Sequence, residues 1–224
     1  MPSPSFLPMR LLQAVLRAFF RLLYHSFAWT YDFVAATVSL GEWKSWGKST
    51  LPYISGTRVL ELGHGPGHLL ASLRDLGLFA VGLDESRQMG RLTAKRLARR
   101  GYAQPNIMRG VSQNLPFANE VFSTVISTFP SEYIFDPRTL TEVSRTLHPG
   151  GRFVVLPAAW ITGHGLTERF MAWLFRVTGQ SADPVGLLND KAKTLFINAG
   201  FKITLERVEQ KSSVALIILA SKES

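Results

Sequence analysis

The sequence predicts an α/β fold in which a largely parallel sheet is covered by helices on both faces. After Gly56, short apolar runs typical of strands alternate with amphipathic patterns typical of helices, which is the order of a parallel sheet with crossover helices. Near the C-terminus, two strand-like runs follow each other without a helix between them. The chain has 224 residues, 46% of them hydrophobic, which is enough to bury one sizeable core.

The elements can be placed in order along the chain. Strands are expected at 57–62, 78–83, 121–126 and 151–156, with a short one at 106–109, and helices at 67–76, 86–100 and 137–147. The tail runs GFKITLERVEQ and SSVALIILAS predict an antiparallel pair at the sheet edge.

Two segments fall outside this alternation. The first 53 residues include 11 aromatic residues. Residues 1–55 are expected to form a helical extension ahead of a domain at 56–224. At about 158–190 an insertion is richer in apolar residues than a surface loop needs. It is expected to form a cap over a pocket, although plain core packing explains its composition equally well.

Composition excludes several classes of site. There are no cysteines, so disulfides and thiolate metal sites are excluded, and no Asp/His cluster has metal-ligand spacing. A formal charge of +9 favours anionic partners such as nucleic acid or an acidic membrane surface. The most apolar stretch, 11–33, is interrupted by Arg17, Arg21 and Asp32 and does not qualify as a membrane span. We therefore expect a cytoplasmic protein that can lie peripherally on the inner face of the membrane.

Residues 9–25 predict an amphipathic helix. At 100° per residue, one narrow stripe collects the polar side chains and the rest of the circumference is apolar, the stripe being Arg10, Gln13, Arg17, Arg21 and Tyr24. Such a helix either lies in a bilayer interface or lines the entry to a lipophilic acceptor pocket. Packing in a dimer or against the core is the alternative.

The stretch VLELGHGPGHLL, residues 59–70, predicts a buried strand that turns into a helix over a ligand. Gly63, Gly65 and Gly67 give G-x-G-x-G, without the third glycine that a dinucleotide fingerprint places at residue 68. No Lys or Arg lies between positions 58 and 74, so a polyphosphate loop is not favoured.

The charged groups around this loop fit a smaller ligand. Glu61 can take an ammonium, Asp84 can accept hydrogen bonds from two ribose hydroxyls, and the helix start after Gly67 offers N–H groups to a carboxylate. An ammonium, a carboxylate and a ribose are the parts of S-adenosyl-L-methionine (SAM).

Five motifs resemble the class I SAM-dependent methyltransferases of the type 11 or ubiquinone/menaquinone C-methyltransferase kind. In the family's order they are VLELGHGPG, VGLDESRQM, QNLPF, LTEVSRTLHPGGRFVVLP and LFINAGF, covering 57–203. Ahead of them, YDFVAATVSLGEWKSWGK resembles the region before the core in quinone-biosynthesis enzymes. The resemblance implies a Rossmann-like, doubly wound, seven-stranded sheet of order 3-2-1-4-5-7-6 with strand 7 antiparallel.

The resemblance also implies a cofactor site for SAM. Its residues would be Glu61, Gly63, His64, Gly65, Gly67, Asp84, Glu85, Met89, Val111, Ser112, Gln113, Ser127 and Thr128. Relatives usually carry Gly-Asp-Ala where this chain has Gly110, Val111 and Ser112. Adenine is therefore expected to rely on backbone, on Ser112 or Gln113, and on apolar packing by Leu83, Met89 or Leu115.

For the acceptor, the aromatic residues near the site are the substrate candidates, namely Tyr24, Tyr31, Trp43, Trp46, Phe129 and Tyr133. Tyr133, Glu132 and His25 are the catalytic candidates, with His164 behind them, and each could equally be ordinary packing or surface. The expected acceptor is a hydrophobic small molecule, quinol-like or lipid. Alternatives are phospholipid headgroup N-methylation and a non-catalytic SAM-binding accessory protein. A nucleic-acid acceptor is disfavoured because 127–136 lacks the Asn/Asp-Pro-Pro-aromatic signature.

Overall fold

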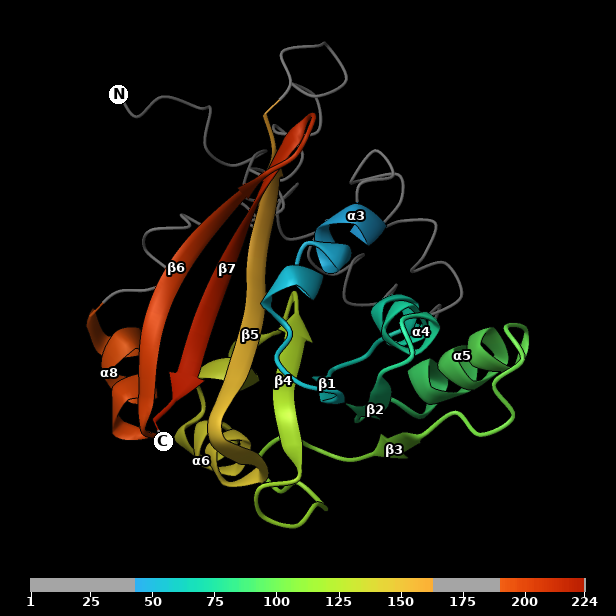
Figure 1. Cartoon of the computed structure of the whole chain (residues 1–224), viewed down its shortest axis with the longest axis horizontal. Coiled ribbons are helices and arrows are strands. Elements are labelled where there is room, and N and C mark those ends of the chain that lie inside the picture. The colour runs from blue at the N-terminus through green and yellow to red at the C-terminus, as the bar shows by residue number, and fades with distance from the viewer. Residues whose placement is uncertain (1–42, 163–189, 224) are drawn as a thin grey trace, which may run out of the picture.

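The computed structural model describes residues 43–162 and 190–223, which form a seven-stranded sheet flanked by helices (Figure 1). The strand order is β3-β2-β1-β4-β5-β7-β6, with β7 antiparallel to both neighbours and the other pairs parallel, as predicted. The strands are β1 Arg58–Leu62, β2 Phe79–Asp84, β3 Ile107–Arg109, β4 Phe122–Thr128, β5 Leu147–Ile161, β6 Phe201–Glu209 and β7 Ser213–Lys222.

Helices cover both faces of the sheet, and two apolar clusters form the core. On one face lie α3 (Trp43–Lys48), α4 (His68–Asp75) and α5 (Arg87–Ala98). On the other lie α6 (Pro137–Thr146) and α8 (Asp190–Asn198). The first face joins side chains of β1 and β4 to the buried Leu70, Leu73 and Leu97. The second packs Leu140, Val143 and Phe196 under the same strands. Because central parallel strands are buried on both faces, their sequences are nearly continuous apolar runs.

The alternation of side chains along β1 decides where its single acid points. Leu60 and Leu62 belong to the α6 face, whereas Val59 belongs to the α4 face. Because successive side chains alternate between faces, Glu61 lies on the α4 side with Val59. The carboxyl of Glu61 is therefore placed under the first turn of α4.

The strand β5 is longer than predicted at both ends. It runs through Ile161, and its last part pairs with β7 from Ala158↔Leu216 to Ile161↔Ser213 after a register shift between Val155 and Ala158. The residues expected to begin the cap are thus strand, and positions 163–189 lie outside the described residues. The shift lies where Pro157 interrupts the ladder, because proline has no N–H to donate.

The β6–β7 turn, next to the end of this extension, anchors α3 near the glycine loop. The indole Nε1 of Trp46 donates to Ser213 Oγ at 2.8 Å, and Ser45 Oγ donates to Gln210 Oε1 at 2.8 Å. Figure 1 places α3 beside the upper parts of β5 and β7, close to α4.

Two short 3₁₀ segments complete the described chain, η2 at Leu51–Tyr53 and η3 at Glu132–Phe135. None of the helices in 43–162 and 190–223 is both long and apolar enough to cross a bilayer. The predicted helix at 9–25 lies outside the described residues.

Candidate functional site

Three glycines turn the chain sharply between β1 and α4. Gly63, Gly65 and Gly67 have φ angles of 66°, 49° and 75°, in the left-handed region that glycine adopts without strain. A Cβ on Gly63 would lie 2.7 Å from the Tyr133 hydroxyl oxygen, and one on Gly67 would lie 2.5 Å from Thr93. A Cβ on Gly65 would meet nothing within 4 Å. The loop is therefore packed beneath Gly63 and Gly67 and open above Gly65, as a ligand-binding loop requires.

Asp84, the last residue of β2, fastens this loop. Its Oδ2 accepts the Gly65 N–H at 2.8 Å, and its Oδ1 accepts the Ser86 N–H at 2.8 Å. Ser86 Oγ in turn accepts the Met89 N–H and caps α5. Each carboxylate oxygen has a second lone pair, so Asp84 can still accept ribose hydroxyls. It orders the loop in addition to the ligand role that the sequence predicted.

Glu61 lies almost entirely out of solvent, at 2% exposure. It accepts the backbone N–H of Leu70 in the first turn of α4, where the N-cap residue Gly67 has no side chain to do so. The other carboxyl oxygen, Oε2, has no hydrogen-bond partner. Burial, and secondarily the charge of Asp84, raises the pKa of Glu61 to about 8. The group is therefore largely protonated at neutral pH until a cation approaches it.

The imidazole of His64 lies beneath the loop, also buried. Its Nδ1 is 2.8 Å from Gly65 O and 3.2 Å from Thr93 Oγ1, and Thr93 Oγ1 donates to Gly65 O at 2.8 Å. The carbonyl neighbour assigns the proton to Nδ1. Burial lowers the pKa of His64, so the ring is neutral. The Gly65 peptide is thus held at its carbonyl by His64 and Thr93 and at its N–H by Asp84.

Two residues that support His64 were missed by the sequence analysis. Thr93 lies on the buried side of α5, and Gly82 lies inside β2, paired with Glu61 on β1. A Cβ on Gly82 would lie 2.8 Å from His64 Cδ2. A glycine within a strand is the signal that could have found this contact, because it often marks a close approach of another group.

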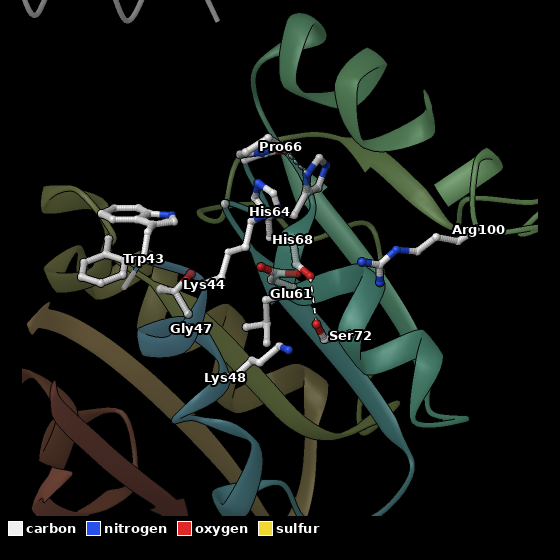
Figure 2. A pocket seen from close by; sticks show the side chains of 15 residues that line it. Trp43, Lys44, Gly47, Lys48, Glu61, His64, Pro66, His68, Ser72 and Arg100 are labelled. Atoms are coloured by element: carbon white, nitrogen blue, oxygen red, sulfur yellow. Dashed lines mark hydrogen bonds between the residues drawn. The ribbon is translucent and has the colours of Figure 1, made fainter. Parts of the chain in front are cut away.

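A pocket of about 130 Å³ opens between the glycine loop, α3, α4 and the end of β4 (Figure 2). It brings together seven of the predicted site residues, namely Glu61, Gly63, His64, Gly65, Thr128, Trp43 and Phe129. Its remaining lining residues were not predicted, and they are Lys44, Gly47, Lys48, Pro66, His68, Leu69, Ser72 and Arg100.

An aromatic wall closes one side of this pocket. Trp43 stacks on Phe129 with ring centroids 4.1 Å apart and an interplanar angle of 22°. Phe129 has a φ of 49°, unusual for a residue other than glycine, and its N–H donates to Leu156 O at 2.7 Å. Trp46 is buried behind this pair, with its ring centroid 6.0 Å from that of Phe129. Trp43 and Phe129 therefore face the pocket, whereas Trp46 supports them.

The two catalytic candidates within the described residues differ in position. Tyr133 is half-buried, and its hydroxyl lies 2.8 Å from Ser127 Oγ, which donates to Leu62 O at 3.0 Å. Glu132 is exposed on η3. Tyr133 is thus brought to the glycine loop and Glu132 is not. The candidates His25, His164, Tyr24 and Tyr31 lie outside the described residues.

The residues predicted for adenine are mostly engaged with the protein. Ser112 Oγ lies 3.0 Å from Thr139 Oγ1, and Gln113 Nε2 donates to Asp136 Oδ2 at 3.2 Å. Met89 is buried, Glu85 is exposed and Val111 is 46% exposed. Leu83 and Leu115 belong to the apolar core. Across the described ranges, no three His, Asp or Glu side chains gather in a way that could hold a metal ion.

Comparisons with known proteins agree with this geometry. Residues 59–151 match the family described as a methyltransferase domain. A demethylmenaquinone methyltransferase of Symbiobacterium thermophilum is 30% identical over 149 residues, which are 62% of this chain and 59% of that protein. A demethylmenaquinone methyltransferase of Thermobifida fusca is 28% identical over 159 residues, or 69% of this chain and 67% of that protein. The chain spans about 60% of the length of the first of these curated relatives.

Solved structures support the fold. A crystal structure from Methanococcus maripaludis, described as a candidate SAM-dependent methyltransferase, gives a TM-score of 0.59 at 17% identity. The alignment covers 88% of this chain and 92% of that one. At this identity the likeness concerns the fold alone.

Proposed function

We propose that this chain, in which residues 59–151 match a methyltransferase domain, is a class I, SAM-dependent methyltransferase that transfers a methyl group from SAM to a hydrophobic, quinol-like small molecule. The observation that carries the proposal is the buried carboxyl of Glu61, which has one unpartnered oxygen and lies on the same pocket as the open face of Gly65. A buried polar atom without a hydrogen-bond partner is costly unless a ligand supplies that partner.

The residues present have the chemistry that SAM requires. Glu61 would take the ammonium, the N-terminal N–H groups of α4 the carboxylate, and Asp84 the ribose hydroxyls. SAM, when bound, supplies a methyl group on a positively charged sulfur that is a good leaving group. The protein's task is then to orient the acceptor and exclude water.

The aromatic wall supports a planar, apolar acceptor. Trp43 and Phe129 line the same pocket as Gly63 and Gly65, so a ring that packs on them would lie next to the cofactor site. The curated relatives are named as demethylmenaquinone methyltransferases, which supports a quinol-like ring in particular.

The test has two parts. S-adenosylhomocysteine (SAH) should bind the full chain in calorimetry, whereas NADH should not. Radiolabelled SAM should then transfer its label to a reduced 2-prenyl-1,4-naphthoquinone extracted into an organic phase. Binding of SAH without transfer to this acceptor or to any component of a total lipid extract would contradict the proposed activity and favour the accessory role.

We also propose peripheral contact with anionic membranes through residues 9–25, from the arginine stripe in the sequence. The full chain should float with anionic liposomes at low salt. A variant with Arg10, Arg17 and Arg21 all changed to Ala should float less, and equal flotation of the two proteins would contradict the contact.

A further inference from the structure

The pocket has a basic side that the cofactor assignment does not use. Lys44 and Lys48 are one helical turn apart on α3, and both line the pocket. Opposite them, His68 and Ser72 are one turn apart on α4 (Figure 2). Gly47 lies between the lysines in sequence, and a Cβ there would meet nothing within 4 Å, so the space between the helices stays open. We call this space, lined by Lys44, Gly47, Lys48, His68 and Ser72, the α3–α4 groove.

Among the described residues, the α3–α4 groove carries the positive charges of two lysines and no negative charge that pairs with them. Lys44 and Lys48 are exposed, and neither forms an ion pair with any residue of the described ranges. Arg100, which also lines the pocket, is paired with Asp75. Among the described lining residues the one acid is Glu61, which burial keeps largely uncharged at neutral pH in the ligand-free protein and which is assigned to the ammonium when the cofactor is bound. A cleft lined by one sign of charge attracts the opposite sign.

We propose that the α3–α4 groove binds an anionic group of the acceptor, a carboxylate or a phosphate, so that the acceptor is an amphipathic acid and not a neutral molecule. This inference rests on the proposed function. The short helix α3 would then hold both ends of the acceptor, the ring on Trp43 and the anion on Lys44 and Lys48.

The proposed site for the acceptor's anionic group and the site assigned to the cofactor's carboxylate lie at different positions along α4. The cofactor carboxylate is assigned to the N–H groups that follow Gly67. Ser72, across the groove from α3, lies four residues beyond His68, which is about 6 Å along the helix axis. Arg100, another lining residue, is paired with Asp75, the last residue of α4. The pocket lining therefore continues toward the C-terminal end of this helix. The groove thus extends along α4 away from the glycine loop and from the assigned position of the cofactor carboxylate.

Calorimetry on the SAH-loaded full chain tests the inference with three probes of eight carbons each, octanoate, octyl phosphate and octanol. We expect at least one anionic probe to bind about tenfold or more tightly than octanol, as charge-assisted hydrogen bonds predict. The double variant K44Q/K48Q keeps much of the side-chain length and should reduce the difference to about twofold. K95Q, at an exposed lysine of α5 away from the pocket, is the matched control and should behave as wild type. The two anions distinguish a carboxylate from a phosphate.

Each other outcome overturns a specific claim. Equal binding of octanol and the two anions, or no binding of any probe, would contradict the anion site. If the protein still binds SAH in that case, the proposed function is not contradicted. Loss of SAH affinity in K44Q/K48Q would assign the lysines to the cofactor instead. If K44Q/K48Q lost binding to phosphatidylglycerol vesicles but still bound the anionic probes more tightly than octanol, the two lysines would be assigned to contact with a lipid surface. Failure of the wild type to bind SAH contradicts the proposed function itself.

Discussion

The ring of His64 occupies the space that a side chain on residue 82 would need. A Cβ on Gly82 would lie 2.8 Å from His64 Cδ2 and 2.8 Å from Leu70 Cδ2. His64 in turn lies against Gly65 O, so a glycine in β2 and a histidine in the loop after β1 together fix the peptide that faces the pocket. The two positions form a matched pair of small and large residues.

This pairing predicts non-additive effects on stability. G82A should lower the free energy of unfolding by about 1–3 kcal/mol, because the added methyl group overpacks a filled site. H64A should also destabilise, through the cavity that it leaves. The double variant should cost less than the sum of the two, since the new methyl group then fills part of that cavity. Urea unfolding measures all three, and additivity to within about 0.5 kcal/mol would contradict the contact.

The buried Glu61 predicts that the ligand-free protein becomes less stable as the pH rises. Its pKa is raised from 4.5 to about 8 in the folded chain, so between these values the unfolded chain gives up the proton first. The free energy of unfolding should therefore fall with pH across this window, by at most about 1.4 kcal/mol per pH unit from this group. Denaturant melts at a series of pH values measure the slope, and Glu61→Gln should remove that contribution.

The same group predicts that an ammonium ligand binds with release of a proton. At pH 7 Glu61 is mostly protonated in the free protein, and the ammonium of SAH favours its ionised form. Calorimetry in buffers of different ionisation enthalpy should detect release of up to one proton at pH 7 and almost none at pH 9.5. A wild-type protein that releases no proton, or an E61Q variant that releases as much as wild type, contradicts the assignment of Glu61 to the ammonium.

Asp84 predicts a combined loss of affinity and loop order. D84A removes the acceptor of the Gly65 and Ser86 N–H groups as well as the expected ribose contact. SAH affinity should fall by about 1.5–3 kcal/mol, or roughly 10- to 150-fold. The melting temperature should fall too, because two backbone donors lose their partner. D190A, at an exposed acid of α8, is the control. Unchanged SAH affinity in D84A would contradict the ribose assignment.

The sequence predicted which residues meet around the glycine loop because local chemistry determines their placement. Three glycines, Glu61 and Asp84 stand at the ends of β1 and β2, and the carboxyl ends of parallel strands meet at one edge of a sheet. The contact between His64 and Gly82 depends on which residues of β1 and β2 are paired, and a single sequence does not specify that register.

Other differences have physical causes of the same kind. The strand predicted at 151–156 stops before Pro157, but a register shift against β7 carries β5 past this proline to Ile161. Ser112 and Gln113 have the right polarity for adenine, yet their side chains bond Thr139 and Asp136 on the side of α6. Lys44 and Lys48 were not predicted as site residues, because a single sequence does not show that α4 lies opposite them.

The position of Tyr133 predicts a positioning role, not that of a general base. Its hydroxyl lies 2.8 Å from Ser127 Oγ and 2.7 Å from where a Cβ on Gly63 would be, so it braces the start of the glycine loop. A general base contributes about 10²- to 10⁴-fold to a rate, whereas loss of a bracing hydrogen bond costs about 1 kcal/mol. Y133F should therefore lower kcat by less than about tenfold. S127A should have a similar effect, because it removes the other half of the same hydrogen bond.

The pH profile of kcat/KM separates the two roles for Tyr133. A bracing hydroxyl leaves the profile of Y133F parallel to that of wild type, because no titrating group has been lost. A base would remove one limb of the profile and would leave S127A much more active than Y133F. E132Q serves as the control, since Glu132 is exposed on the same 3₁₀ turn and should retain wild-type rates. A rate loss above about 100-fold in Y133F alone would overturn the positioning role and return Tyr133 to the catalytic residues.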